Sequence, residues 1–392
     1  MPGYEVMGPE ELAEIQDIFG RGAILFRHGF DALRGDCYKV REFEQTFAST
    51  MGSPHALAVS SGTAALRVGL AALGVGAGDE VITQSFTFVA TVEAIIESRA
   101  TPVCAEIDAT LNLDPEDLKR RITPRTKAVI VVHMLGTPSR LPEIKAICDE
   151  HDIALIEDAA WGCGGSLHGR ALGSWGRLGT FSFDFAKTMT TGEGGLVLFQ
   201  QQEDWARGAA WHDHGHENNP AVPRWEDTRA SSGFNFRMME LQGAVGLAQL
   251  RKLPDIVTAQ RCNRDKLWNA ICDLPGITPR EVPEGSYETA DALVFFVQDN
   301  AAARRCREAL LARGLATKIL PEAFTWHFAG TWTHMPELAS AHGGNLSEAF
   351  PQSAALLSRA VSLPVGVKLR EDAPSLARQA LLEALQPQEA RV

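Results

Sequence analysis

Lys187 is the residue whose surroundings most clearly indicate chemistry. It lies in the segment SFDFAKTMTTGEGG (182–195), between apolar side chains and a glycine-containing loop. Burial among apolar neighbours favours the neutral amine, lowers its pKa and makes it a nucleophile that can form a Schiff base. The alternative is a structural lysine that keeps its ammonium in water, followed by a β-turn.

A carboxylate, Asp158, ends the apolar run IALIED (153–158). If this run is a strand of a parallel sheet, its carboxyl end is where such folds bind their ligands. Asp158 could therefore bind a metal, act as a general base or pair with a cationic ring nitrogen. The alternative is a cap for the turn that follows.

The segment SSGTAAL (60–66) has the residues of an anion-binding helix start. Gly62 lets a ligand approach the backbone, Thr63 offers a hydroxyl, and the first N–H groups of a helix favour an anion. An ordinary helix N-cap is the alternative. The spacing differs from that of the GxxxxGK[ST] phosphate loop, so it does not indicate a nucleoside triphosphate.

Together these three segments supply what pyridoxal 5'-phosphate needs. An anion pocket holds the phosphate, a carboxylate keeps the ring nitrogen protonated, and a lysine carries the aldehyde as an imine. The residues Gly62, Asp158 and Lys187 follow one another in that order along the chain. The sequence therefore predicts a site for this cofactor.

Short β-type runs alternate with longer amphipathic stretches from about residue 38, which predicts a mostly parallel sheet covered by helices on both faces. The predicted strands are LAVS (57–60), EVIT (80–83), PVCAEID (102–108), AVIVVH (128–133) and IALIED (153–158). Apolar spacing predicts helices at 40–51, from residue 63, at 89–98 and at 141–150. Two further runs, TFSFDF (180–185) and GLVLF (195–199), lie so close together that we expect a differently connected pair of strands.

Past about residue 250 the pattern changes to a polar helix at 255–270, a strand at 292–298, a helix at 301–313 and a helical tail at 371–386. We therefore expect two domains, a large cofactor-binding domain over 1–250 and a smaller C-terminal α/β domain over 251–392. The polar segment 211–232 is predicted to be a long loop, an element that often carries function.

The composition limits the class of partner. The chain has 392 residues, of which 45% are hydrophobic and 22% charged, as expected for a folded globular protein. A net charge of -12 disfavours nucleic acid and the anionic face of a membrane, although a local basic site could hold a small anion. The seven cysteines have no CxxC spacing, and the sequence shows neither a signal-peptide pattern nor an apolar run of membrane-spanning length. We expect a cytoplasmic protein with reduced thiols.

The motifs SGTAAL, EDAA, SFxxxKxxTTGEGG and GFNFRMMELQGAVGLAQL (233–250) resemble those of the DegT/DnrJ/EryC1/StrS family of pyridoxal-phosphate sugar aminotransferases. The resemblance extends over roughly residues 1–260. It implies the α/β architecture of fold-type-I aminotransferases and a homodimer with composite active sites. It also implies ping-pong transfer of an amino group from glutamate or glutamine to a keto or aldehyde sugar.

The resemblance further implies roles for single residues. Lys187 would be the imine-forming lysine and proton shuttle, and Asp158 the partner of the pyridinium nitrogen. The remaining residues would bind the cofactor: Gly62, Thr63 and Ser182 at the phosphate, Phe88 stacked on the ring, and Asn235 at the phosphate from the other subunit.

Two segments depart from the family pattern. Where the family has Gln or His close to the cofactor hydroxyl, this chain has Trp161, which can stack or donate one hydrogen bond but cannot accept one. The usual segment with Pro, His and Tyr is replaced by LPEAFTWHFAGTWTHM (320–335). We therefore expect the substrate end of the site to differ from that of the nucleotide-sugar enzymes.

The segments FDFAKTMTTGEGG, DHGHENNP and DTR resemble the branch that aminates the C8 aldehyde of 3,8-dideoxy-8-oxo-manno-octulosonate. A sugar acid of this kind needs cationic partners for its carboxylate. The candidates are Arg224, His216, Arg229 and His327, each of which could equally be an ordinary surface charge.

Three other functions stay open. The chain could aminate a nucleotide-linked keto sugar or a cyclitol, it could be a related sugar dehydratase, or it could be a non-catalytic sensor. The dehydratases of the family carry His at the lysine position, so Lys187 argues against them.

The alternating residues His212, His214 and His216 would lie on one face of a strand, as zinc ligands can. The Asn and Pro residues beside them favour a loop instead, so no metal site is expected.

Overall fold

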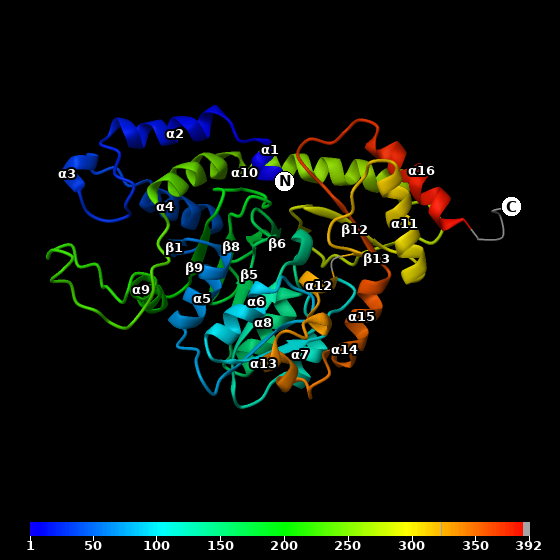
Figure 1. The fold of residues 1–392 in the computed structure, drawn as a ribbon, viewed down its shortest axis with the longest axis horizontal. Helices are drawn as coiled ribbons and strands as arrows, with labels where there is room; N and C mark the ends of the chain where they lie inside the picture. The colour runs from blue at the N-terminus through cyan, green and yellow to red at the C-terminus, as the bar shows by residue number, and fades with distance from the viewer. Residues whose placement is uncertain (323, 387–392) are drawn as a thin grey trace.

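The computed structural model describes residues 1–322 and 324–386, and a seven-stranded sheet forms its centre (Figure 1). The strands are β1 (His55–Val59), β2 (Glu80–Gln84), β3 (Thr101–Ala105), β4 (Thr126–Val132), β5 (Ala154–Asp158), β8 (Leu178–Ser182) and β9 (Gly195–Phe199). Their order is β1-β9-β8-β5-β4-β2-β3; β9 pairs antiparallel with β1 and β8, and the other adjacent strands are parallel. The mostly parallel sheet and the differently connected pair are both confirmed.

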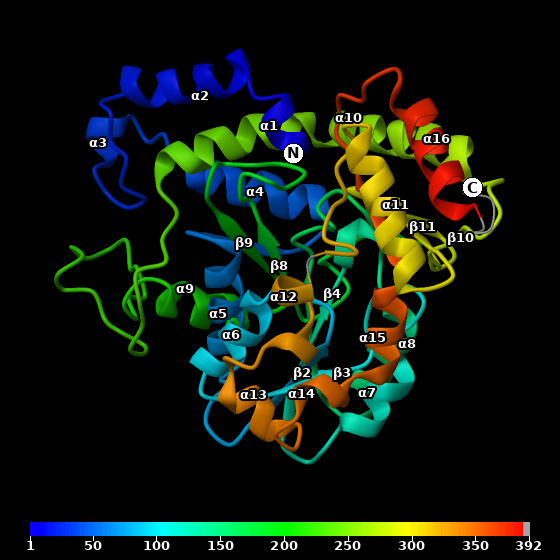
Figure 2. The same ribbon diagram turned by 45° about the vertical axis from the view of Figure 1, so that its right-hand side comes forward.

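Both faces of this sheet are buried, because side chains alternate along a strand. In β1, Leu57 and Val59 face one hydrophobic core, whereas Ala56 and Ala58 face another. The turned view in Figure 2 shows helices on both sides of the sheet. The first core is covered by α5 (Gly62–Ala72), α6 (Ala90–Glu97) and α9 (Gln202–Trp211), and the second by α4 (Lys39–Met51), α7 (Pro115–Arg121) and α8 (Leu141–Glu150).

A long helix, α10 (Glu240–Ile271), packs on α2 (Pro9–Gly20), α4 and α16 (Ala373–Leu385) (Figure 1). Two glycines let α4 come close: a Cβ on Gly243 would lie 2.7 Å from the backbone nitrogen of Val40, and one on Gly246 would lie 2.9 Å from the ring of Phe43. The predicted helix at 255–270 is the C-terminal part of α10. The predicted domain boundary at residue 250 falls inside this helix, and the division into two domains stays a prediction.

The C-terminal part contains an antiparallel sheet of β10 (Thr278–Pro279), β12 (Ala292–Phe296) and β13 (Ala360–Pro364). With α11 (Asn300–Ala312) and α16 it encloses a third core. Phe328, Trp332 and Phe350 instead join the first core of the main sheet. They belong to the stretch that contains α12 (Phe324–His327), α13 (Pro336–Ala341), α14 (Leu346–Ala349) and α15 (Pro351–Ser358).

The remaining elements are short. They are α1 (Pro2–Glu5), α3 (Asp31–Arg34), two 3-10 turns (Met134–Gly136 and Ala329–Thr331), and a small sheet of β6 (Ser166–Leu167), β7 (Arg170–Ala171) and β11 (Ser286–Tyr287). Among residues 1–322 and 324–386, no helix has the length and apolar character needed to cross a membrane.

Residues 212–239 contain neither helix nor strand, which confirms the predicted loop. The buried Asp213 lies against His28, Arg224 and Arg237, which ties the loop to the N-terminal segment. Burial opposes ionisation of Asp213, but the hydrogen bonds from His28 and Arg224 hold the pKa of this carboxyl well below its usual range. In the part of the chain that the structure describes, no group of three or more His, Cys, Asp or Glu residues is arranged to hold a metal ion.

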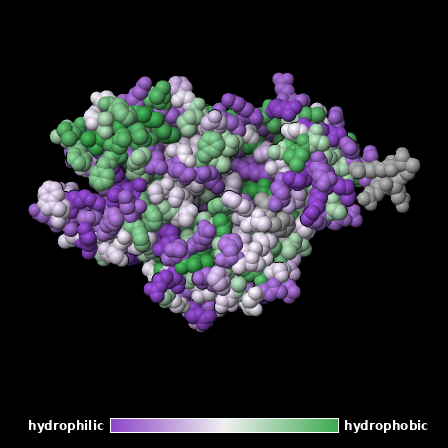
Figure 3. Space-filling view, in the orientation of Figure 1, coloured by the Kyte–Doolittle hydropathy of each residue, from purple (hydrophilic) through white to green (hydrophobic). Residues whose placement is uncertain are grey.

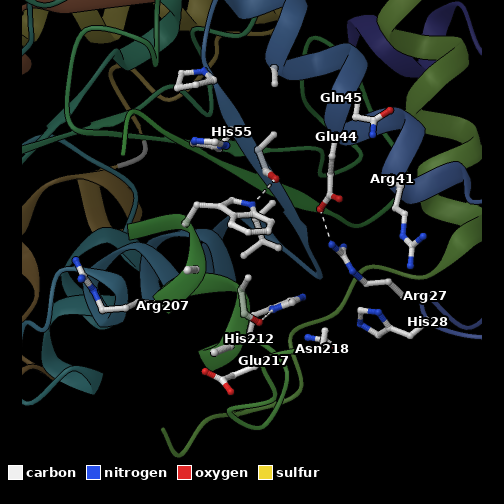
Figure 4. Close-up of a pocket in the computed structure, with 18 of the residues that line it drawn as sticks. Arg27, His28, Arg41, Glu44, Gln45, His55, Arg207, His212, Glu217 and Asn218 are labelled. Carbon is white, nitrogen blue, oxygen red and sulfur yellow. Dashed lines mark hydrogen bonds and ion pairs between the residues drawn. The ribbon is translucent and has the colours of Figure 1, made fainter. Parts of the chain in front are cut away.

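Strand β1 lies at one end of the main sheet, where side chains bind its outward backbone groups. Glu44 accepts a hydrogen bond from the N–H of Ala58 at 2.6 Å, and Arg27 donates to the carbonyl of Ala58 at 3.1 Å. The indole N–H of Trp205 donates to the carbonyl of Ala56 at 3.1 Å. Arg27 and Glu44 also form an ion pair at 2.7 Å (Figure 4). This group borders a hollow of about 640 Å³ that none of the predicted site residues lines.

Candidate active site

The carboxyl ends of the parallel strands border a second cavity, of about 440 Å³. Most of the predicted site residues line it, and they come from the ends of several strands: Gly62 and Thr63 after β1, Phe88 after β2, Asp158 and Trp161 at β5, Ser182 and Lys187 at β8, and His327 in α12. Residues widely separated in the sequence therefore meet at one edge of the sheet, as parallel topology predicts.

Lys187 follows β8 and is half-buried. Its N–H donates to the carbonyl of Asp184 at 3.0 Å, and its own carbonyl accepts a hydrogen bond from the N–H of Gly3 at 3.2 Å. Its Nζ lies 3.6 Å from the ring centroid of Trp161. Burial lowers the pKa of Lys187 to about 8, although the carboxylates of Asp291 and Asp158 oppose the shift. The amine is therefore far more reactive near neutral pH than that of an ordinary lysine.

The loop after Lys187 is closed by backbone hydrogen bonds. Phe183 donates to the carbonyl of Gly194 at 2.9 Å, and Thr191 donates to the carbonyl of Phe183 at 3.0 Å. Gly192 has a φ of +83°, a conformation that favours glycine. A Cβ on Gly194 would lie 2.4 Å from Oγ1 of Thr191. These two glycines thus allow the tight return of the chain that holds Lys187 at the cavity.

Asp158 is buried and has few partners. Its Oδ1 accepts a hydrogen bond from the N–H of Ala160 at 3.1 Å, and Oγ1 of Thr91 lies 3.5 Å from its Oδ2. Burial raises its pKa, which means that the carboxylate lacks full compensation for its charge. A cationic group in the cavity, such as a protonated ring nitrogen, would supply it.

The neighbouring acid, Glu157, has a structural role. It is fully buried and accepts hydrogen bonds from the N–H groups of Gly173 at 2.8 Å and Gly176 at 2.7 Å. Nε2 of His133 lies 3.1 Å from Oε2, the same oxygen that accepts from Gly173. Of the two acids at the end of β5, Asp158 alone lines the cavity.

An anion cradle lies where α5 begins. Ser61 caps this helix by accepting a hydrogen bond from the N–H of Ala64 at 3.0 Å. A Cβ on Gly62 would lie only 2.7 Å from Cβ of Ser182, so a glycine is needed for β8 to come this close. The hydroxyls of Thr63 and Ser182 thus meet the first N–H groups of a helix, which favours a phosphate.

Aromatic side chains form another wall. Phe88 is 38% exposed, and its ring centroid lies 6.2 Å from that of Trp326 and 5.6 Å from that of His327. An accessible ring in a cavity is suited to stack on a planar ligand. Trp326 and His327 come from the segment 320–335 in which the chain departs from the family pattern.

Four of the predicted residues lie outside this cavity, and one of them, Arg224, forms an ion pair with Asp213. Asn235 and Arg229 are exposed, and His216 is buried with its Nδ1 3.1 Å from Oδ2 of Asp227. All four belong to the loop of residues 212–239. Within one chain the structure therefore does not bring His216 or Arg229 to Lys187.

Thr91 and Trp326 are two of the cavity residues that the sequence analysis did not identify. Thr91, which approaches Asp158, lies one helical turn after Phe88, and that spacing could have identified it. Trp326 directly precedes His327, but an isolated tryptophan in an unusual segment gave no signal of its own.

The residues fit pyridoxal 5'-phosphate on the basis of their chemistry. The cradle at Gly62 suits a phosphate, the poorly compensated Asp158 suits a protonated ring nitrogen, and the amine of Lys187 suits an aldehyde.

Comparisons with known proteins agree with this fit. The family model described as the DegT/DnrJ/EryC1/StrS aminotransferase family matches residues 31–377. Spore coat polysaccharide biosynthesis protein SpsC of Bacillus subtilis is 37% identical over 70% of this chain and 70% of its own. GDP-perosamine synthase of Vibrio cholerae is 37% identical over 60% of this chain and 63% of its own. The solved structure of an aminotransferase from Psychrobacter cryohalolentis superposes with a TM-score of 0.84 at 27% identity, over 96% of each chain.

Proposed function

Because the chain belongs to the DegT/DnrJ/EryC1/StrS aminotransferase family, whose members depend on pyridoxal 5'-phosphate, we propose that it transfers an amino group from glutamate or glutamine to the carbonyl of a sugar through Lys187. The observation that carries the role of Lys187 is its position: a lysine whose pKa is lowered to about 8 shares one cavity with a buried carboxylate and an anion cradle.

In this proposal, Gly62, Thr63 and Ser182 hold the cofactor phosphate, and Phe88 stacks on the ring. When bound, the cofactor supplies an aldehyde that exchanges amino groups and a protonated ring that accepts electrons. Asp158 holds the proton on the ring nitrogen, because a buried anion stabilises a nearby cation.

Lys187 has two tasks. Its neutral amine binds the aldehyde, and once the donor amino acid has displaced it, the same amine accepts the proton from Cα of that donor. The indole of Trp161, 3.6 Å from Nζ, stabilises the ammonium form that results. Trp161 thus supports Lys187 instead of accepting a hydrogen bond from the cofactor.

The acceptor we propose is the C8 aldehyde of 3,8-dideoxy-8-oxo-manno-octulosonate. Trp326 and His327 support an acceptor of this kind. Both line the cavity, and both belong to the segment 320–335, in which this chain departs from the family pattern. The second candidate is a nucleotide-linked keto sugar, and the relative named GDP-perosamine synthase favours it.

The two acceptors can be separated with protein loaded with pyridoxamine 5'-phosphate. We expect the octulosonate aldehyde to restore the visible absorbance of the lysine-bound cofactor, and a nucleotide-linked keto sugar to leave the spectrum unchanged. The reverse result would replace the proposed acceptor with the second candidate. Keto acid formed from glutamate beyond one equivalent per active site, without any sugar carbonyl, would contradict amino transfer as such.

We further propose a homodimer in which Asn235 reaches the phosphate site of the other subunit. Asn235 is exposed on the long loop, and the neighbouring Phe234 is 59% exposed. A second apolar region lies over α2 and α3, at the upper left of Figure 3, and includes Leu12, Phe19, Phe30 and Leu33. Apolar surface of this extent supports burial against a second copy. Such a dimer could also bring Arg229 and His216 to the substrate of the partner.

Mixing two inactive variants tests the shared site. Lys187→Ala and Asn235→Ala chains, mixed under conditions that let subunits exchange, should regain about a quarter of the wild-type activity, since half the dimers hold one intact site. Activity is followed as keto acid formed from glutamate. No recovery, in a mixture that light scattering shows to be dimeric, would contradict a site built from two subunits.

A further inference from the structure

The indole of Trp161 lies within reach of two ammonium groups. Nζ of Lys187 is 3.6 Å from the ring centroid, and Nζ of Lys318 is 4.8 Å from it. Both distances allow a cation–π interaction. Lys318 lies between α11 and α12, so a residue of the C-terminal part comes close to the lysine of the candidate site.

The second lysine, Lys318, is paired with the carboxylate of a buried aspartate. Asp291, directly before β12, is buried, and its Oδ2 forms an ion pair with Nζ of Lys318 at 2.5 Å. The backbone holds both partners in place, because Val365 donates to the carbonyl of Asp291 at 3.1 Å and Lys318 donates to the carbonyl of Ser362 at 2.8 Å.

The same part of the chain is fixed against Trp161. Thr289 donates from Oγ1 to the carbonyl of Trp161 at 3.0 Å, and its N–H donates to the carbonyl of Gly136 at 3.2 Å. The Asp291–Lys318 pair and the indole therefore keep a defined relation to each other.

Charged groups from several elements act on the ammonium of Lys187. Asp291 and Asp158 stabilise it most, Lys318 destabilises it, and Asp184 of its own loop stabilises it to a smaller degree. Glu193 and His327 also line the cavity. The effect of Asp291 on Lys187 is thus at least as large as that of Asp158, the carboxylate with the proposed cofactor role.

We propose that Asp291 and Lys318 form a positioning pair for Lys187, acting on its amino group across the indole of Trp161. The pair touches neither of the reacting partners named above, and the inference rests on the proposed role of Lys187. The two members carry opposite charges, so removing them one at a time should shift the ionisation of Lys187 in opposite directions.

The test measures the ionisation of Lys187 in the full chain freed of cofactor. The rate of its acetylation by acetic anhydride is followed against pH by mass spectrometry of the peptide that contains it. In the wild type the midpoint should lie at about 8. Asp291→Asn should lower the midpoint by about one pH unit, and Lys318→Met should raise it by about as much. The double variant should return close to the wild-type value.

Matched controls come from the Lys145–Asp149 pair on α8, which has the same 2.5 Å separation. Lys145→Met and Asp149→Asn should leave the midpoint unchanged, as should Lys318→Arg, which keeps the charge. If Asp291→Asn does not fold, the midpoints of Lys318→Met and Lys318→Arg still test the proposal, because only the first variant removes the charge.

Shifts of both single variants in the same direction, or no shift, would overturn the positioning pair. A general loosening of the site would move both midpoints up toward that of an exposed lysine. The proposed function is tested by a different measurement: it fails if Lys187→Ala retains full amino transfer. That result would not change the titration midpoints measured on chains that keep Lys187.

Discussion

Replacing Lys187 with alanine should lower amino transfer to a sugar carbonyl by about a thousandfold or more, because the variant loses both the amine that binds the aldehyde and the base that accepts the Cα proton. The half-buried amine, with its pKa lowered to about 8, is the group in the cavity best suited to both tasks. The measurement is the formation of keto acid from glutamate in the presence of the acceptor.

Lys119→Ala is the matched control, since this lysine forms an exposed ion pair with Glu116 on α7. It should retain wild-type activity. A Lys187→Ala chain that still transfers amino groups at the wild-type rate would show that a different residue carries the reaction.

Asp158→Asn should reduce the transfer rate by about a hundredfold or more while leaving most of the cofactor bound. The asparagine keeps the shape of the side chain but removes the negative charge that holds the proton on the ring nitrogen, and the ring then accepts electrons less well. The phosphate cradle at Gly62, Thr63 and Ser182 is untouched. Activity and cofactor content after gel filtration are measured on the same sample.

Glu157→Gln provides a contrast from the adjacent position. Glu157 binds buried N–H groups away from the cavity, so its replacement should lower the melting temperature. An Asp158→Asn variant that lost stability and cofactor together, with no separate loss of rate, would reduce Asp158 to the same structural role.

The sequence predicted the main sheet and its site edge well, and the reason is physical. Strands buried on both faces must be continuously apolar, so runs such as AVIVVH and IALIED were recognisable without further information. A polar residue directly after such a run lies at the carboxyl edge. Asp158 and Lys187 could therefore be expected to meet there although nearly thirty residues separate them.

Other features depend on contacts that no local pattern encodes. The first half of α10 contains Gly243 and Gly246, which lower helix propensity, and their close packing on Val40 and Phe43 became visible only in three dimensions. The hydrogen bond from Gly3 to Lys187 joins α1, near the start of the sequence, to the loop after β8. Asp291 and Lys318 belong to no recognisable motif. Their importance comes from the position of Lys318 beside Trp161 and from its ion pair with Asp291.

The side chains beside β1 also affect how the molecule behaves in a crowded solution. An end strand with free N–H and carbonyl groups can recruit a strand from another molecule, which leads to aggregation. Here Glu44, Arg27 and Trp205 already bind both backbone groups of Ala58 and the carbonyl of Ala56. A foreign strand would have to break a buried ion pair before it could add to the sheet, so this end of the sheet is closed to edge-to-edge association.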